Sequence, residues 1–408
     1  MRKIVTALIA LACCLAPAAA SGFFAWEDGS ASVTARAAVD LTATFMGNNG
    51  PRVLYPEPSE GIAAAGLRLL VNATLLDRVR IDLNAYQDLD AATVGRSFMT
   101  STVPTAYRST YLDRDWGGAG GKISAPLAVD ALSLKLFLGP ADLTVGRQPV
   151  GLSTTFIFTP NDLFHPFSAG AADTAFRPGV DAARLDWRLG ALGSLTAVGV
   201  MGYDFDDRPA WHHSAALGRA SVNAAGFDWS VLGGKTDGRS LAGGAIAGEI
   251  WRLGVRAEGN VSFPTRRGAD PYAQVAGGLD YRWESSLHLM VEYYYHQNGG
   301  TDPIGYLTQL GGRDLTVDPY LGRHYLGAML SGKPTPLLLL QGAVVANLSD
   351  PSAYAIPALV YNAASEVDFI LYGTIPIGRY PSRTEYPELN SEFGLYPYSA
   401  TLLSRMYF

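Results

Sequence analysis

The sequence predicts an all-β protein: a single-chain transmembrane antiparallel β-barrel of about 18 strands (16–18), with short periplasmic turns and long external loops. Three observations predict this fold. Apolar and polar residues alternate along most of the chain, as in strands whose two faces meet different surroundings. No apolar run of about 18 residues follows the first 21, so helices that cross a membrane are not expected. The connections between the expected strands fall into a short set and a long set.

The segment Ala131–Leu138 shows the alternation clearly, with leucine at every second position. The pattern recurs in Arg78–Gln87, Val180–Leu189, Trp251–Val261 and Ser286–Gln297. In these segments, rows of Arg, Glu and Tyr lie opposite rows of Leu, Val and aromatic residues. A soluble sandwich would also alternate, with its apolar residues inward, but rows of such large polar residues over nearly 400 residues without a domain break disfavour it. They favour a barrel that is apolar outside and polar inside.

Alternation places the expected strands in chain order. They are 31–46, 62–74, 77–87, 130–138, 142–148, 179–189, 194–203, 213–222, 226–235, 239–248, 252–262, 271–282, 286–297, 320–332, 336–347, 353–363, 366–375 and 397–408. The short connections are Leu75-Leu76, the Gly139 turn, Gly190–Gly193, Trp283–Ser285, Gly332–Thr335 and Ala364-Ser365, and all fall on one side. Long connections such as Gly151–Pro178 and Asn298–Pro319 fall on the other side. The segment around Tyr107 to Trp116 is interpreted as a loop, because another strand would make the number odd.

The composition fits a β-protein with many turns. The chain has 408 residues, 45 of them Gly and 21 Tyr, and only 17% are charged. The net charge of −6 indicates no particular partner, and a nucleic-acid-binding protein would normally be basic, so no nucleic acid is expected. No linker, repeat or low-complexity tract divides the chain, which indicates one barrel domain.

The first 20 residues have the three regions of a secretory signal peptide: Met1-Arg2-Lys3, the apolar run Ile4–Leu15, and Ala18-Ala19-Ala20. We predict cleavage after Ala20, which makes 1–20 the signal peptide and 21–408 the barrel. A transmembrane anchor is disfavoured because the apolar run is short, and a lipoprotein signal at Cys13 lacks a good small-residue box. Cleavage would leave no cysteine, hence no disulfide, no thiolate metal site and no haem attachment.

The last residues, Leu402–Phe408, end in an aromatic residue with further apolar residues two positions apart. This resembles the closing-strand signal of Gram-negative outer-membrane barrels, which their assembly machinery recognises at a terminal Phe. Together with the signal peptide and the alternation, Phe408 predicts insertion into the cell outer membrane. Outer-membrane lipid and the barrel assembly machinery are therefore expected partners.

The inward rows predict the lining of a pore, because a barrel of this size leaves an aqueous lumen that side chains cannot fill. The predicted lining residues are Arg78, Arg80, Asp82, Lys135, Arg184, Asp186, Arg188, Arg252, Arg256, Glu258, His288 and Glu292. One interpretation is a transverse field that selects solutes by charge. The other is a set of mutually neutralising pairs that only stiffens the wall.

The long connection Gly151–Pro178 carries five Phe, too many for a solvated loop. We predict that it folds into or over the lumen as a constriction, with polar groups presented by Asp162, His165, Asp173 and Arg177. The alternative is a packed external cap. Strict alternation places the nearby Arg147 on the outward face, whereas a bulge at Gly146 would turn it inward. Both placements of Arg147 are open at this point.

Nothing in the sequence indicates catalysis or a metal site. The six His are scattered, and no His is singled out with a Ser or Asp partner. The glycine-rich run 117–122 lacks the first Gly of a phosphate-binding loop and is followed by Ile123 where Ser or Thr is required. The sequence therefore predicts no enzyme, no metal and no cofactor.

Three runs carry a resemblance to a known family: Leu143–Gln148, Phe156–Phe164 and Arg177–Asp181. They resemble Gram-negative outer-membrane porin-like β-barrels, distantly the alginate-export-type porins, and the barrels that accompany multihaem cytochromes in porin–cytochrome conduits. The resemblance implies a monomeric barrel of about 18 strands and supplies no ligand residue.

Two functions follow as hypotheses. The first is a channel for passive passage of small hydrophilic solutes, with anionic ones as a candidate class. The second is a sheath that holds a separate multihaem cytochrome in a trans-outer-membrane electron conduit. A third and weaker hypothesis is an outer-membrane enzyme.

Overall fold

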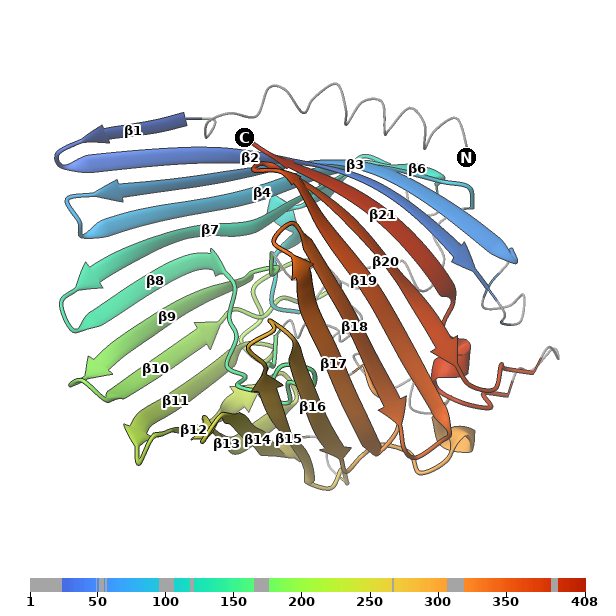
Figure 1. The fold of residues 1–408 in the computed structure, drawn as a ribbon. Helices are drawn as coiled ribbons and strands as arrows, with labels where there is room; N and C mark the ends of the chain where they lie inside the picture. Colours follow the sequence, from blue (N-terminus) through green and yellow to red (C-terminus); the bar gives the residue numbers. More distant parts are fainter. Residues whose placement is uncertain are drawn as a thin grey trace.

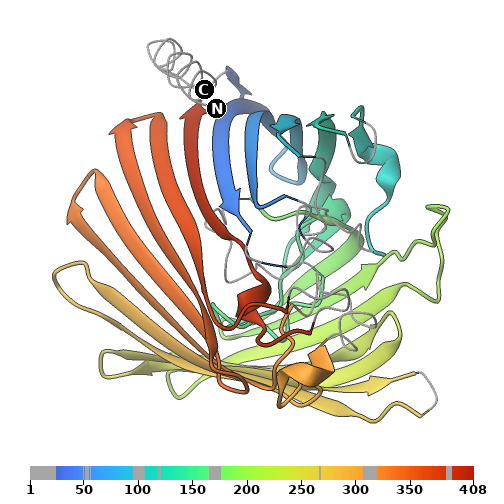
Figure 2. The ribbon, with the colours of Figure 1, turned by 90° about the vertical axis from the view of Figure 1, so that its right-hand side faces the viewer.

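The computed structural model describes residues 24–48, 50, 55, 57–94, 106–117, 121–164, 176–265, 268–306, 319–382 and 388–408. Over these residues the strands form one sheet (Figure 1). Eighteen of them make a closed antiparallel ring, because β2 (Ala31–Gly47) pairs with both β3 (Ser59–Leu75) and the last strand, β21 (Tyr398–Tyr407). In Figure 2 the strands are seen surrounding the interior of the barrel. The predicted fold class is confirmed.

The other fifteen strands of the ring follow in chain order. They are β4 (Val79–Ala92), β7 (Pro126–Leu138), β8 (Ala141–Gln148), β9 (Val180–Leu189), β10 (Gly193–Val200), β11 (Ala215–Ala224), β12 (Phe227–Thr236), β13 (Arg239–Ile250), β14 (Leu253–Pro264), β15 (Tyr272–Arg282), β16 (His288–His296), β17 (His324–Thr335), β18 (Leu338–Asn347), β19 (Ser352–Ala364) and β20 (Val367–Ile377). Each matches one predicted strand to within a few residues. The largest difference in a turn is after β17, which runs on to Thr335, so that its turn is Pro336-Leu337.

Three short strands extend the edges of the ring. β1 (Phe24–Asp28) pairs with the start of β2, where β21 no longer reaches. β6 (Ile123–Ser124) pairs with the end of β4, and β5 (Arg114–Asp115) pairs with the start of β7. The segment around Tyr107 to Trp116, predicted as loop, therefore contains the 3-10 helix η2 (Thr110–Leu112) and β5 without adding a strand to the ring.

One end of the barrel has only tight turns. In the turn between β3 and β4, Leu76 and Asp77 both have positive φ, 51° and 53°, as the two central residues of a type I′ turn do, and the N–H of Arg78 donates to the carbonyl of Leu75 at 3.0 Å. The other end carries the long connections, among them 149–179, 297–323 and 378–397. By the rule for outer-membrane barrels, the tight turns are periplasmic and the long connections external.

The two faces of the wall differ as predicted. Exposed apolar side chains such as Leu67, Leu132 and Val231 cover the outer face. Trp187, Trp229, Trp251 and Trp283 are exposed close to the tight turns, the position of an interfacial aromatic girdle. Among the described residues, no helix is both long enough and apolar enough to cross a membrane.

Candidate functional site

The chain leaves the wall where β8 ends and crosses the inside of the barrel as the segment 151–164, which we call the constriction loop. β8 is short, eight residues, and Gly146 within it has a φ of +118°. A Cβ at Gly146 would lie 2.3 Å from the carbonyl oxygen of Leu132, so only glycine fits this backbone. In Figure 1 the chain continues from the end of β8 toward β16 and β17.

Glu292 of β16 fixes the tip of the constriction loop from the opposite wall. Its carboxylate accepts hydrogen bonds from the backbone N–H groups of Phe156 (2.8 Å), Ile157 (2.8 Å) and Phe158 (3.0 Å). The carboxylate is buried, with 1% of the residue exposed. Three backbone donors that belong to no strand are thereby satisfied.

Glu258 of β14 bonds to the loop both before and after its tip, at residues 153–155 and at Asn161. It accepts from the hydroxyl of Ser153 and the N–H groups of Thr154, Thr155 and Asn161. Beside it, the side-chain amide of Asn260 donates to the carbonyl of Pro160 at 2.8 Å. The predicted lining residues Glu258 and Glu292 therefore bind backbone, a role that alternation could not indicate.

Apolar contacts complete the seating of the loop. Phe158 is buried and stacks on Tyr294, with ring centroids 5.2 Å apart and an interplanar angle of 12°. At the other end, Leu152, Leu163 and Phe164 belong to a buried cluster. The cluster also contains Tyr107, Val150, Val180, Ala182, Val198, Val200, Ala215, Leu217, Leu232 and Leu241.

Two of the four polar residues predicted for the constriction form an ion pair. The carboxylate of Asp162 lies 2.6 Å from Nη2 of Arg177 and ties the loop to the chain that returns to β9. Burial raises the pKa of Asp162 to about 7, against the pull of Arg177 in the opposite direction. His165 and Asp173 lie outside the described residues.

The departure of β8 leaves the edges of β7 and β9 without a partner, and the segment 106–117 fills the gap. β5 pairs with β7 at Leu127 and Pro126. On the other side, the N–H of Asp181 donates to the carbonyl of Tyr107, and the N–H of Tyr203 to that of Ala106. A segment predicted as loop is therefore part of the wall.

Arg147, next to the last residue of β8, lies at the centre of this patch. Its side chain is fully buried. It donates to the carboxylates of Asp181 (2.8 Å) and Asp113 (3.2 Å) and to the carbonyls of Ser109 (2.6 Å) and Val129 (3.3 Å). Arg147 pairs across the ladder with the outward-facing Leu132, so the strict-alternation placement is the one found. Segment 106–117 shields it.

Most of the other predicted lining residues stand in neutralising pairs. Arg80 pairs with Asp82, Lys135 with Asp142, Arg184 with Asp186, and Arg256 with Asp280, which also contacts His288. Arg78 and Arg252 lie in tight turns rather than on strands, and Arg188 donates to the carbonyl of Gly139 in another turn. These three residues are at the periplasmic mouth.

Arg219 of β11 was not predicted as a lining residue. It donates to the carbonyl of Leu152 at 3.1 Å and to Oγ1 of Thr154 at 3.4 Å, at the start of the constriction loop. It is the single charge in its strand. That isolation, on the inward face, is the signal that could have identified it.

No family model matches this chain, and no curated protein matches it. Solved structures do. OccK9 (OpdG) of Pseudomonas aeruginosa is 10% identical, with 92% of this chain and 98% of that chain covered and a TM-score of 0.59. OccAB3 of Acinetobacter baumannii is 10% identical, with 92% and 99% covered and a TM-score of 0.56.

A third solved structure, OccK11 (OpdR) of Pseudomonas aeruginosa, is 14% identical, with 92% and 96% covered and a TM-score of 0.52. The likeness at this identity is one of fold. The chain has the 18-strand fold of Gram-negative outer-membrane porins, as the resemblance of its sequence implies.

Proposed function

We propose that this porin-fold chain is an outer-membrane channel for the passive passage of small hydrophilic solutes. The observation that carries the proposal is the constriction loop, which crosses the barrel and is fastened to the opposite wall by Glu258 and Glu292. A loop held in this way narrows the aqueous lumen that a barrel of this size encloses. Phe156 on the loop remains 53% exposed, and Arg256 lies 4.2 Å over its ring.

Anionic solutes are the finer part of the proposal. The neutralising pairs described above present little net charge to a solute. Arg219 differs, because its two hydrogen bonds beside the constriction go to uncharged acceptors, and the nearby carboxylate of Glu258 is bonded to the loop instead. A guanidinium in that position attracts a passing anion and raises the energy of a passing cation.

The test is the conductance of the purified full chain in a planar bilayer. We expect discrete steps, and a reversal potential in a KCl gradient that favours chloride. Arg219→Gln should lower the chloride-to-potassium permeability ratio roughly twofold, because one charge is removed from the constriction. Arg219→Lys, which keeps the charge, is the matched control. An unchanged ratio in Arg219→Gln would refute the anion preference alone.

The cytochrome sheath gives a different result in the same preparation. A sheath would co-purify with a haem-staining polypeptide and would not conduct when pure. The constriction loop favours the channel, because it occupies part of the lumen that a guest protein would need. Non-conducting protein with bound haem would overturn the channel.

The proposal includes the route to the membrane. Residues 1–20, proposed as a signal peptide, lie outside the described residues. Phe408 continues the ladder of β21, since it exchanges backbone hydrogen bonds with Ala37 at 3.1 and 2.8 Å. We propose it as the residue that the assembly machinery reads on the closing strand.

A further inference from the structure

Two segments far apart in the sequence contact the same side chain in the barrel. One is the tip of the constriction loop, and the other is the segment 388–396, which belongs to the last external connection. Tyr325 of β17 lies between them and is fully buried. The buried cluster around it contains Ile157 and Phe158 of the loop and Phe393 of the external segment.

The hydroxyl of Tyr325 bonds to the external segment. It donates to the carboxylate of Glu392, which is fully buried at the start of the 3-10 helix η4 (Phe393–Leu395). The same carboxylate accepts from the N–H of Leu321 at 2.9 Å and from the side-chain amide of Asn347 at 2.6 Å. Glu392 is thereby bonded to two side chains of the wall and to one backbone group of the connection 297–323.

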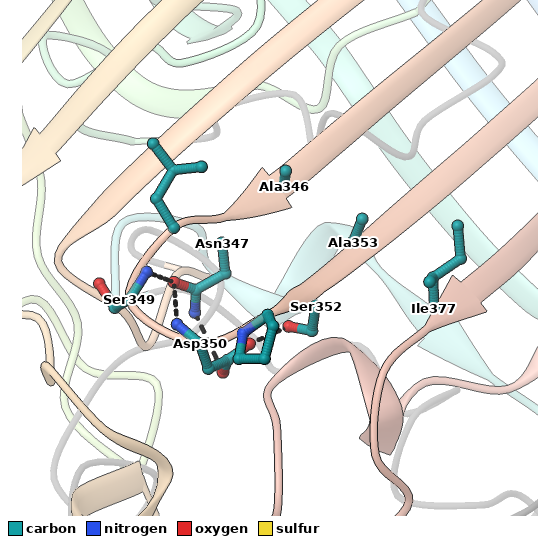
Figure 3. A pocket seen from close by; sticks show the side chains of 9 residues that line it. Ala346, Asn347, Ser349, Asp350, Ser352, Ala353 and Ile377 are labelled. Carbon is teal, nitrogen blue, oxygen red and sulfur yellow. Dashed lines mark hydrogen bonds between the residues drawn. The ribbon is translucent and has the colours of Figure 1, made fainter.

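The turn between β18 and β19 supports this attachment. It lines a pocket of about 440 Å³, in which Asn347, Ser349, Asp350 and Ser352 bond to one another (Figure 3). Asp350 also accepts from the N–H of Glu392 at 2.9 Å. Because these polar groups are used within the turn, it acts as a rigid support for Glu392.

The ring of Tyr325 serves the constriction loop. Its centroid lies 6.1 Å from that of Phe158 and 6.3 Å from that of Phe393. A shift of Phe393 therefore reaches Phe158 through one intervening ring. Since packed aromatic side chains cannot move independently, the loop tip and the external segment share one arrangement.

We infer that Glu392 is a positioning residue that acts through Tyr325 on the tip of the constriction loop, so that the external segment 388–396 sets the width of the pore. This inference rests on the proposed channel function for its meaning, although the contacts that carry it do not. One external connection, 378–397, would then control a constriction that is formed by another, 149–179.

The ionisation of Glu392 should modulate this control. The titratable groups that face it are Asp350, Tyr306, Tyr325 and Tyr396. Burial raises the pKa of Glu392 from 4.5 to about 7. A raised folded pKa means that the docked segment binds a proton more tightly than a released one, so docking weakens as pH rises from about 4.5 to about 7.

The experiment combines two readouts on the full chain. Single-channel recording measures the time spent in a widened state between pH 5 and pH 8. In a parallel series, Ile157→Cys, which places a buried thiol at the loop tip, reports release of the tip by its rate of maleimide labelling. The variants are Tyr325→Phe, which keeps the ring, and Glu392→Gln. The control is Tyr354→Phe, whose ring also stacks on Phe393, with centroids 6.0 Å apart, and which leaves Glu392 untouched.

We expect Tyr325→Phe to raise both the widened fraction and the labelling rate about tenfold, as loss of a hydrogen bond to a charged group implies. Glu392→Gln should remove the part of the pH dependence that is due to Glu392 and leave the part due to Asp162, whose pKa is also raised to about 7. Tyr354→Phe should match the parent. Equal labelling in Tyr325→Phe and Tyr354→Phe at all pH values would overturn the inference. Altered labelling without any conductance in the parent would support the coupling and overturn the channel instead.

Discussion

The constriction loop is held at its two ends by opposite chemistry. Where it departs, at the end of β8, the guanidinium of Arg147 donates to the carbonyl of Val129 in β7 and to that of Ser109 in the segment 106–117. Where it arrives, at β14 and β16, the loop presents N–H groups, and the carboxylates of Glu258 and Glu292 accept them. A non-strand segment within a barrel has no ladder to join, so buried side chains must supply its partners.

The difference explains why one end needs a larger construction. The carboxylates of Glu258 and Glu292 take their hydrogen-bond donors from the loop itself. Arg147 instead forms ion pairs with Asp113 and Asp181, and Arg108 is bonded in turn to Asp113 at 2.7 Å. The patch 106–117 brings Asp113 to this position. The departing end thus depends on a second segment, and the arriving end does not.

The largest effect is expected at the arriving end. Glu292→Gln keeps the volume but turns an NH₂ group toward backbone donors, and each lost hydrogen bond to the carboxylate is worth roughly 1.5–3 kcal/mol. We expect the tip to leave its seat and the single-channel conductance to rise at least about twofold. Asp186→Asn is the matched control, because Asp186 bonds Arg184 and Thr196 but no loop backbone. Equal conductance in both variants would show that Glu292 does not hold the loop.

At the departing end the expected effect is on stability. Arg147→Ala removes the arginine counter-charge of Asp181, whereas Asp113 keeps its pair with Arg108, and breaking such a buried pair typically costs about 3–5 kcal/mol. Denaturant unfolding of the refolded barrel, followed by tryptophan fluorescence, would measure it. Arg80→Ala, with its half-exposed pair to Asp82, should cost about 1 kcal/mol or less. A similar loss of unfolding free energy in the two variants would show that Arg147 does not stabilise the segment 106–117.

The smallest effect is expected from a test of the backbone conformation of β8 at Gly146. Gly146→Ala adds a methyl group where φ is +118° and the nearest carbonyl is 2.3 Å away, and such strain costs about 1–3 kcal/mol. Gly199→Ala on β10 adds the same methyl where no atom lies within 4 Å. Unfolding midpoints should fall in the first variant and stay near the parent in the second. A drop in both would point to glycine content rather than to this bend.

Alternation predicted the strands because the outer face of every strand meets lipid and the inner face meets water or polar groups. It failed at the ends of strands: Arg78 and Arg252 were assigned to strands but lie in turns, since one residue of register decides between the two. It also could not separate Glu258, which binds loop backbone, from Asp186, which pairs with Arg184. Both are acidic residues on inward faces.

A ring of about eighteen strands, its apolar exterior and its short-turn end could be predicted from the amino-acid order, because each depends on a period of two and on local turn residues. The burial of Arg147 under segment 106–117 and the contacts of Tyr325 with both Glu392 and Phe158 became visible only in the folded chain. Those contacts join residues 38 to 167 positions apart in the chain. These residues come together because the ring closes, and no local sequence pattern predicts such contacts.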